Sequence, residues 1–415
     1  MDINQLQYTG QLKVSVISTV AYIPIEDATV TIAPTAEAED ILLRLTTNSS
    51  GETESVSLDT PPLAYSEEFE EGRKPYAEYN VMAEADGYES VLVTGVEILP
   101  GQQALLRVRM TPKDMTNEQE QLIPISPHTL YYEYPPKIPE AEIKPMAETG
   151  EIVLSRVVIP EYIIVHDGVP SDASAPNYWV RYKDYIKNVA SCEIYSTWPE
   201  AAIYANILVI MSFTLNRVYT EWYRNQGYDF TITSSTAYDQ KFVYGRNIFE
   251  NIDRLVDNIF ANYLSRPGVR QPIFTSYCDG KRVTCNGLSQ WGSKYLGDEG
   301  YSAIEIIRYY YGNDMYINTA ELISGVPSSF PGYDLTIGSS GDKVRQMQTQ
   351  LNRIARNYPA IPTITVDGIY GPATAEAVGT FQEIFDLPVT GIVDYATWYE
   401  ISDIYVGVTR ISEPD

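Results

Sequence analysis

The chain has few cysteines and histidines for its length. Three cysteines and two histidines occur among 415 residues, so there is no disulfide framework, and a zinc amidase or endopeptidase is disfavoured. Basic residues are also scarce, with 29 Lys and Arg against 55 Asp and Glu, which gives a formal net charge of −26. A chain this acidic is a poor partner for nucleic acid or an anionic membrane surface. We therefore expect no nucleic-acid partner.

A long uninterrupted apolar run is also missing. The longest, near residues 201–213, is too short to span a bilayer and contains Asn206, which predicts a buried helix and no membrane span. Residues 1–5 carry neither the basic nor the apolar region of a secretory signal. The apolar content of 44% is enough to bury cores. The length predicts two to four domains.

The first part of the chain has the pattern of short strands. Residues 8–111 alternate apolar and polar side chains over runs separated by Gly, Asn and Asp turns, which predicts a β-sandwich. The motifs at residues 27–32, 47–51 and 85–88 resemble those of carboxypeptidase-regulatory-like domains. Residues 112–150 contain seven prolines among acidic residues. They predict an exposed, partly polyproline-like linker where a protease can cut.

The remaining chain predicts two further domains. Residues 151–325 mix helical and strand patterns, and residues 334–405 have the pattern of a compact helical module. The predicted fold class is therefore a multidomain α+β protein. It has an N-terminal β-sandwich, a central mixed α+β catalytic-type domain and a C-terminal three-helix bundle.

The C-terminal segment repeats one arrangement of turns and helices. Residues 337–344 open a helix, residues 366–374 place Asp-Gly and Gly-Pro turns before a second, and residues 387–398 lead into a third. This pattern resembles the peptidoglycan-binding-1 family, a three-helix module. The resemblance implies binding of glycan strands or stem peptides. We expect the Gly, Asp and Thr positions of the motif to be mostly structural, because they make turns and caps.

Residues 185–202 place a glutamate, Glu193, shortly before a Trp-Pro pair. From the pattern alone, a glutamate on an amphipathic helix is usually a solvated surface residue. The segment, however, resembles the stage II sporulation protein D/LytB family, which contains lytic transglycosylases. The resemblance implies that Glu193 is the catalytic acid. The apolar neighbours Ile194 and Trp198 would raise its pKa toward neutrality, whereas Glu200 is expected to charge the first turn of the next helix.

One carboxylate is enough for this chemistry. It protonates the leaving oxygen and then deprotonates the sugar's own 6-hydroxyl, whereas a hydrolase normally needs a second carboxylate. The sequence departs from the family where that family has Lys and Arg, because Tyr204 and Met211 stand there. Either Arg217 or Lys281 replaces them, or the activity is altered or absent.

Three later segments also resemble this family in the right order, at residues 230–245, 287–293 and 300–312. The last two correspond to the family patterns around Ser-Gln-Tyr-Gly and a closing Tyr-Tyr pair. The alternative for residues 289–291 is a turn with a packing Trp. The predicted substrate-binding residues are Trp198, Tyr238, Tyr277, Lys281, Ser289, Gln290 and Trp291.

The cysteines leave several interpretations open. Cys278 and Cys285 could be half a zinc site, as in some members of the resembled family, or a free thiol pair or reversible disulfide. No other cofactor is expected. Cys192 with His166 gives only generic support for a nucleophile, and a small buried residue beside the acid is the better interpretation. His166 and Asp167 read as a structural pair at a strand end.

The order of segments resembles the germination-specific spore cortex-lytic enzymes. The resemblance implies cortex peptidoglycan as substrate, location in the spore cortex or coat region without a signal peptide, and a zymogen. The β-sandwich would then be a pro-region, and a subtilisin-like protease would cut the linker. A competing hypothesis is a non-catalytic wall-binding or structural protein of a spore coat or phage-tail-like particle. A third is a hydrolase that uses Glu193 with another carboxylate.

Overall fold

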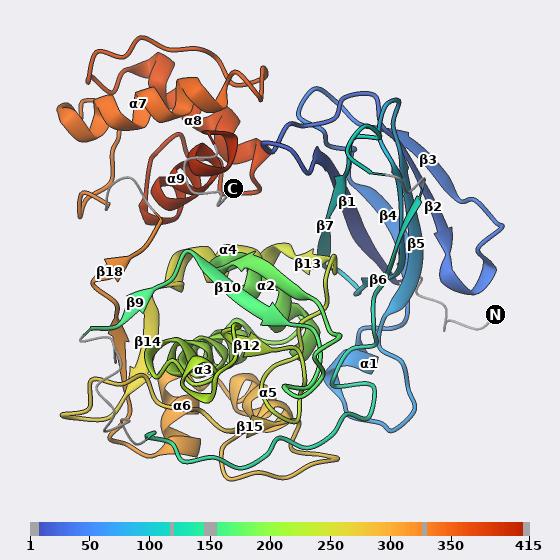
Figure 1. Ribbon diagram of the computed structural model, residues 1–415, viewed down its shortest axis with the longest axis vertical. Helices are drawn as coiled ribbons and strands as arrows, with labels where there is room; N and C mark the ends of the chain where they lie inside the picture. The colour runs from blue at the N-terminus through green and yellow to red at the C-terminus, as the bar shows by residue number, and fades with distance from the viewer. Residues whose placement is uncertain (1–7, 117–119, 145–155, 326–329, 410–415) are drawn as a thin grey trace.

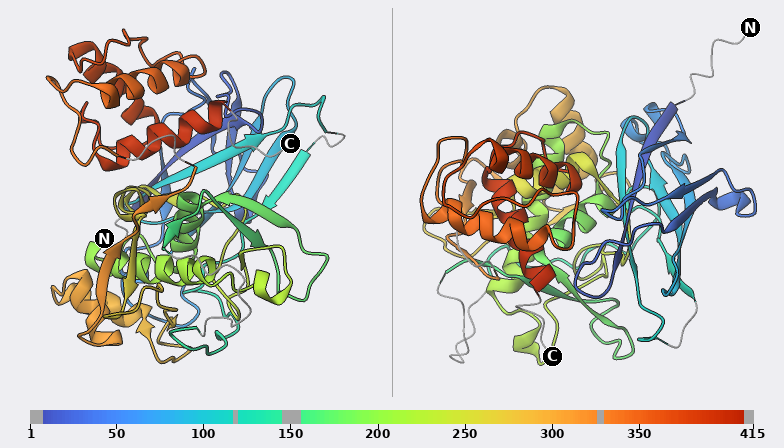
Figure 2. Two further views of the ribbon diagram at one scale, coloured as in Figure 1. Left: turned by 60° about the vertical axis from the view of Figure 1, so that its left-hand side comes forward. Right: turned by 90° about the horizontal axis from the view of Figure 1, so that it is seen from above.

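The computed structural model describes residues 8–116, 120–144, 156–325 and 330–409. It is a mixed α+β protein built from several packed parts (Figure 1), which confirms the mixed, multidomain class. The right-hand view of Figure 2 shows the N-terminal strands as a block beside the helices of the rest of the chain. Below, residues 8–116 are the N-terminal part, residues 156–325 the central part and residues 330–409 the C-terminal module.

The N-terminal part consists of strands and one short helix. They are β1 (Tyr8–Ser18), β2 (Thr29–Pro34), β3 (Leu43–Thr46), β4 (Val56–Thr60), α1 (Ala64–Glu67), β5 (Ala77–Glu84), β6 (Ser90–Ile98) and β7 (Gln103–Met110). Alternate residues of β1, among them Leu12 and Val14, are fully buried. The same holds for Leu106 and Val108 of β7. The strand alternation predicted for these runs is thus confirmed.

Two sheets are completed by strands from outside the N-terminal part. β8 (Glu120–Pro124) pairs parallel to β6 and closes the sheet β3-β2-β5-β6-β8. β13 (Ile248–Phe249), from the central part, pairs with β7 in the sheet β13-β7-β1-β4. Beside β13, Arg246 forms a buried ion pair with Glu97. The two parts are therefore joined by main-chain pairing and by a buried charge pair.

The segment expected to be an exposed linker is ordered and packed over residues 120–144. After β8, residues 127–144, here called the strap, run along the lower edge of the central part (Figure 1). Three of its own residues, His128, Leu130 and Lys144, are buried against the rest of the protein. The prolines keep this chain extended, and an extended chain can lie along a neighbouring surface as readily as in water. Residues 145–150 of the expected linker lie outside the described residues.

The central part places one long helix in its core. α3 (Glu200–Tyr219) is long and apolar enough to cross a membrane, yet 83% of its most apolar window is buried. The predicted buried helix is confirmed and is longer than the apolar run suggested. Around it lie α2 (Tyr182–Glu193), α4 (Glu250–Ile259), α5 (Gln290–Asp298) and α6 (Ala303–Tyr311). The strands are β9 (Val158–Ile159), β10 (Tyr162–His166), β11 (Asn177–Arg181), β12 (Ile232–Thr233), β14 (Asn262–Ser265), β15 (Tyr277–Cys278), β16 (Leu288–Ser289), β17 (Tyr316–Thr319) and β18 (Leu322–Ile323).

The C-terminal module contains α7 (Asp342–Ile354), α8 (Pro372–Ile384) and α9 (Tyr395–Thr409). Two buried glutamines brace its turns in the same way. The Gln348 side chain accepts from the Gly368 N–H at 2.8 Å and donates to the Ile369 carbonyl at 3.0 Å. Gln382 accepts from the Gly391 N–H at 2.8 Å and donates to the carbonyl of Ile392 at 2.8 Å. Gln348 and Gln382 therefore hold the turns of the module together.

The module is docked on the central part through buried charges. The Lys183 ammonium of α2 lies 2.6 Å from a Glu400 oxygen and 2.9 Å from an Asp403 oxygen, both on α9. The next turn of α2 repeats the pattern, because Lys187 pairs with Asp253 of α4 at 2.6 Å. Breaking one partner of such a pair leaves a buried charge without compensation. Ion pairs from Lys183 and Lys187 thus hold α2, the helix that ends in Glu193, against α9 and α4.

Candidate functional site

Glu193 is the last residue of α2, and its side chain points into the protein. Its exposed fraction is 3%. The Tyr277 hydroxyl donates to one carboxyl oxygen at 2.6 Å, and the Lys241 N–H donates to the other at 2.8 Å. The Gln290 side chain donates to the main-chain carbonyl of Glu193 at 3.0 Å. The carboxyl group and its backbone are therefore fixed by three residues from distant segments.

The surroundings favour the neutral form of this carboxyl group. Burial raises the pKa of Glu193 above its ordinary value, against the opposing effects of Lys137 and of the hydrogen bonds from Lys241 and Tyr277. Removal from water disfavours a charged carboxylate, and this outweighs the nearby cation here. A raised pKa favours the protonated carboxyl group, the form from which a general acid donates its proton.

The strap closes the space next to Glu193. A cavity of about 80 Å³ remains there, lined by Glu193, Tyr277 and Gln290 on one side and by strap residues, among them Lys137, on the other. The Lys137 ammonium donates to the Asp239 carbonyl and lies 4.5 Å from the centre of the Tyr277 ring. Pockets that hold small ligands usually measure about 300–1,000 Å³. A sugar ring does not fit while the strap is in place.

Four of the predicted substrate-binding residues lie at or near this cavity. Tyr277 and Gln290 contact Glu193 directly, as described. The Tyr238 carbonyl accepts from Arg217 at 3.0 Å at the edge of the strap. Ser289 caps α5, because its hydroxyl accepts from the Gly292 N–H at 2.9 Å. The structure thus gives Ser289 a structural task beside the site.

The two predicted tryptophans lie in the core. Trp198 and Trp291 have ring centres 5.1 Å apart and are 3% and 2% exposed. The indole N–H of Trp198 donates to the Ser66 carbonyl of α1 at 2.8 Å. This corrects the expectation that these rings line the cleft. An aromatic residue near a turn has the same sequence pattern whether it packs or binds, and both of these pack.

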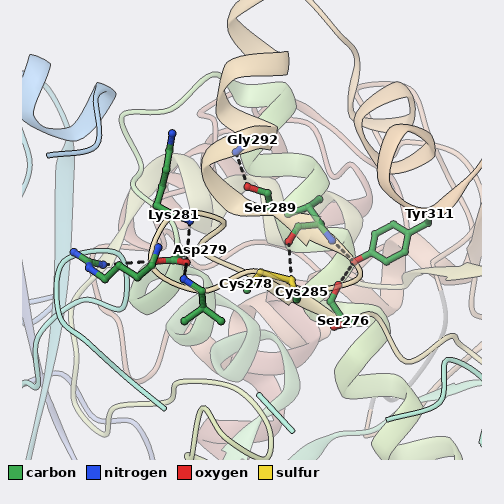
Figure 3. The surroundings of a disulfide bond; sticks show 11 residues. Ser276, Cys278, Asp279, Lys281, Cys285, Ser289, Gly292 and Tyr311 are labelled. Atoms are coloured by element: carbon green, nitrogen blue, oxygen red, sulfur yellow. Dashed lines mark hydrogen bonds and ion pairs between the residues drawn. A yellow bond between two sulfur atoms is a disulfide. The ribbon is translucent and has the colours of Figure 1, made fainter. Parts of the chain in front are cut away.

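Cys278 and Cys285 form a disulfide (Figure 3). Asp279 holds the intervening loop, since its carboxylate accepts N–H bonds from residues 281–283 at 3.1, 3.1 and 2.9 Å. Lys281 is exposed and points away from the disulfide in Figure 3, with its ammonium 4.9 Å from the Tyr295 ring centre. It therefore does not contact Glu193 in this state.

A zinc ion does not fit this cysteine pair, because both sulfurs are used in the disulfide. Among the described residues, no group of three or more His, Cys, Asp and Glu side chains is gathered as a metal site would need. Of the interpretations left open for the pair, the structure has the disulfide.

A Cys–His nucleophile is not assembled at Cys192. Burial raises the pKa of the Cys192 thiol to about 12, so the thiolate is disfavoured. His166 stacks on Phe230 and contacts the Asn177 side chain at 2.8 Å. His166 is thus a structural residue, and its side-chain partner is Asn177 where Asp167 was expected.

Arg217 is buried beside the strap and does not reach Glu193. Its guanidinium donates to Asp239 at 2.7 Å and to both oxygens of strap residue Glu140 at 2.8 and 2.6 Å. Met211, at the family's Arg position, is fully buried, and Tyr204 is partly so. Sequence reasoning named Arg217 but missed its strap partner, because acidic residues in a proline-rich segment give no local sign of what they contact.

Lys241 and Lys137 were missed as neighbours of the acid. Lys241 contributes through its main-chain N–H, which no residue type reveals. Lys241 directly follows residues 230–240, and the resemblance of those residues to the family was the only sequence feature that pointed to this position. Lys137 lies in the segment expected to be a linker, where nothing indicated burial.

A larger cavity, of about 500 Å³, lies at the junction of the three parts. Arg107, Arg109, Arg181 and Asp184 are among the residues that line it, together with aromatic side chains of β10 and β11. None of the predicted site residues lines it. This cavity is therefore separate from the residues predicted to form the site.

Known proteins match the C-terminal module. Residues 340–401 match the family described as "Putative peptidoglycan binding domain". The chain is also 43% identical over 68 residues to a zinc D-Ala-D-Ala carboxypeptidase from Streptomyces albus G, a match that covers 16% of this chain and 25% of the relative. The chain thus spans about a quarter of the length of this curated relative. Residues 340–401 are thus similar to a peptidoglycan-binding domain.

Solved structures give only weak likenesses. A minor pilin of Streptococcus agalactiae has a TM-score of 0.18 at 13% identity, covering 26% of this chain and 45% of that one. A 3-chlorocatechol 1,2-dioxygenase from Rhodococcus opacus 1CP has a TM-score of 0.17 at 12% identity, with coverages of 27% and 62%. A catechol 1,2-dioxygenase from Acinetobacter sp. ADP1 has a TM-score of 0.18 at 12% identity, with coverages of 30% and 60%. Scores this low give no basis for inferring function.

Proposed function

We propose that this protein is an enzyme that cleaves peptidoglycan glycan strands between N-acetylmuramic acid and N-acetylglucosamine by lytic transglycosylation. The observation that carries the proposal is the buried carboxyl group of Glu193, whose pKa burial raises, in a chain with a peptidoglycan-binding domain. The resemblance of residues 185–202 to the stage II sporulation protein D/LytB family supports the same reaction.

The proposed reaction uses Glu193 twice. Its proton moves to the glycosidic oxygen while the bond from that oxygen to muramic acid C1 breaks. The resulting carboxylate then accepts the proton of the muramic acid 6-hydroxyl as that oxygen bonds to C1, which closes a 1,6-anhydro ring and returns the acid to its starting form. The Tyr277 hydroxyl holds one carboxyl oxygen in both stages.

The neighbouring carboxylates support this reaction over hydrolysis with two carboxylates. Asp279 lines the same cavity, but three backbone N–H groups of its own loop donate to its oxygens. Asp239 is buried and paired with Arg217 at 2.7 Å. A hydrolase needs a second carboxylate free to attack the sugar or to activate water. Both of these carboxylates of the central part are already engaged, and the other carboxylate that lines the cavity, Glu133, belongs to the strap.

The position of the strap supports the proposal that the protein is made as a zymogen. Residues 127–144 leave a space too small for a sugar beside Glu193, so the chain must open before it can act. We propose that a subtilisin-like protease cuts within residues 112–150 and that the β-strands before the cut form a pro-region. The resemblance to spore cortex-lytic enzymes supports cortex peptidoglycan as the substrate and the spore cortex or coat region as the location.

A second candidate is a non-catalytic peptidoglycan-binding or structural protein of a spore coat or phage-tail-like particle. Two observations favour it. The residues at the family's Lys and Arg positions, Tyr204 and Met211, cannot supply a cation. The space beside Glu193 is also too small for a sugar ring in the structure. In this alternative Glu193 would be a buried structural acid, and the C-terminal module would be the functional part.

One assay separates the candidates. The purified chain, intact or cut within residues 112–150, is incubated with cortex-type peptidoglycan, and the new glycan ends are identified by mass spectrometry. The enzyme proposal predicts anhydro-muramic ends from the cut wild type and none from Glu193→Gln. The control is Glu200→Gln, which makes the same change at an exposed position. Reducing ends would indicate a hydrolase, and no new ends at all would favour the binding protein.

A further inference from the structure

The strap carries acidic side chains onto arginines of the central part. Glu140 accepts two hydrogen bonds from Arg217, at 2.8 and 2.6 Å. Glu142 accepts two from Arg266, at 2.7 and 2.8 Å. Both pairs have the two-pronged geometry by which a guanidinium recognises a carboxylate. Arginine stays charged, so these two positions keep their affinity for carboxylates when the strap leaves.

The surface under the strap also offers main-chain and side-chain hydrogen bonds along its length. The Ile138 N–H donates to the Ala237 carbonyl at 2.7 Å, and the Phe274 N–H donates to the Glu142 carbonyl at 2.8 Å. Further along, the Gln271 side chain accepts from the Lys144 N–H at 2.8 Å. We call this surface, formed by residues 213–217, 237–241, 266 and 271–277, the strap groove. Hydrogen-bonding groups spaced along a surface in this way suit an extended oligomer with many polar groups.

The strap groove contains a cluster of aromatic rings and passes the candidate acid. The Phe213 and Phe274 rings have centres 4.5 Å apart, and the strap bends over them at residues 142–143. Lys137 lies over Phe213 and Tyr277, with ring centres at 4.8 and 4.5 Å, and Lys144 lies 3.9 Å from that of Phe274. Aromatic faces of this kind also take the apolar faces of sugar rings. At one end, Tyr277 is bonded to Glu193.

We propose that the strap groove is the binding site for glycan strands that carry free carboxylates. Glu140 and Glu142 hold the places that substrate carboxylates take on Arg217 and Arg266. The inference rests on the proposed function, because it takes Glu193 as the point of cleavage. It also gives an acidic polymer two cations to contact in a chain whose formal net charge is −26.

The test compares full-length chains in a binding titration with soluble glycan strands. One preparation keeps its free carboxylates, and in the other they are amidated. The double variant Glu140→Gln/Glu142→Gln weakens the strap and removes its carboxylates from both arginines, which keep Asp239 and Asp314 as their other partners. We expect it to bind the carboxylate strands about tenfold more tightly than the wild type, roughly one charged hydrogen-bonding pair. Amidated strands should show no gain, and the C-terminal module contributes equally to every chain.

The matched control is Asp114→Asn/Glu120→Gln, which removes two charges from exposed positions outside the groove and should leave affinity unchanged. Adding Arg266→Gln to the strap variant should reduce its gain, because Arg217 alone then remains. Arg266 and Glu142 are partly exposed, so Glu142→Gln alone serves if the double variant does not fold. An equal gain for amidated strands, or a gain that Arg266→Gln leaves undiminished, overturns the proposal.

The proposal about binding and the proposal about cleavage can be rejected independently of each other. A carboxylate-dependent gain in binding without any Glu193-dependent cleavage would keep the groove and reject the enzyme. Cleavage by the cut wild type without a gain in the strap variant would keep the enzyme and reject the groove.

Discussion

The C-terminal module and the Glu193 pocket hold their polar groups in opposite ways. In the module, Gln348 and Gln382 bond to turns 20 and 9 residues away in the chain. In the Glu193 pocket, the two residues that donate to the carboxyl group, Lys241 and Tyr277, lie 48 and 84 residues away in the sequence. The strap, which precedes Glu193 in the chain, covers this pocket. A motif made of local contacts can be recognised from its spacing. A site assembled from distant segments depends on how whole parts of the chain pack.

The largest expected effect comes from breaking the long-range packing. Arg246→Ala leaves Glu97 as a buried carboxylate without its partner and should lower the stability of the N-terminal and central parts by about 3–5 kcal/mol. Hydrogen exchange should show faster opening of β7 and α2, with unchanged protection in α7 and α8. Arg44→Ala, at an exposed position on β3, is the control. Equal loosening of the C-terminal module would show that the two regions are not independent.

A smaller effect is expected from breaking the local contacts of the module. Gln382→Ala leaves the N–H of Gly391 and the carbonyl of Ile392 without their side-chain partner, which should cost about 1–3 kcal/mol. Binding to insoluble peptidoglycan should weaken in a pull-down assay, while the exchange of the Glu193 segment stays unchanged. Gln346→Ala, on α7 at a partly exposed position, should have little effect. Unaltered binding after the module has loosened would contradict the assignment of binding to it.

The pH dependence of cleavage should report the Glu193 pKa. Burial raises that pKa, and the Tyr277 hydrogen bond opposes the rise. Cleavage needs the protonated form, so the rate should fall as the pH rises through the pKa of Glu193 in the folded protein. In Tyr277→Phe the opposing hydrogen bond is lost, so the fall in rate should occur at a higher pH. If the fall occurs at the same pH as in the wild type, the Tyr277 hydroxyl does not lower the pKa of Glu193.

The same shift predicts a small effect on stability. A carboxyl group whose pKa is higher in the folded than in the unfolded chain binds more protons when folded. Its contribution is therefore fully present below the unfolded pKa and is lost as the pH rises through the folded pKa. Glu193→Gln should remove this dependence, so the stability of the wild type should fall relative to the variant between acidic and neutral pH. Parallel curves from chemical denaturation at several pH values would contradict the pKa direction.

Sequence alone predicted what local patterns determine. The alternation around Leu12 and Leu106, the buried helix near residues 201–213 and the turns of the C-terminal module follow from periodicity and turn chemistry. The strap could not be predicted, because prolines favour the same extended backbone whether the segment is in water or lies on a surface. The contact of Tyr277 with Glu193 was missed for a related reason, since a hydroxyl bond across 84 residues leaves no pattern.

The most direct measurement is the analysis of glycan ends after the chain is cut within residues 112–150. The account predicts that the cut wild type releases anhydro-muramic ends from cortex peptidoglycan. It also predicts that Glu193→Gln reduces the rate by at least about a hundredfold, the lower range for a lost general acid. The uncut chain should release no anhydro-muramic ends. Release of the same ends by cut Glu193→Gln at an undiminished rate would contradict it.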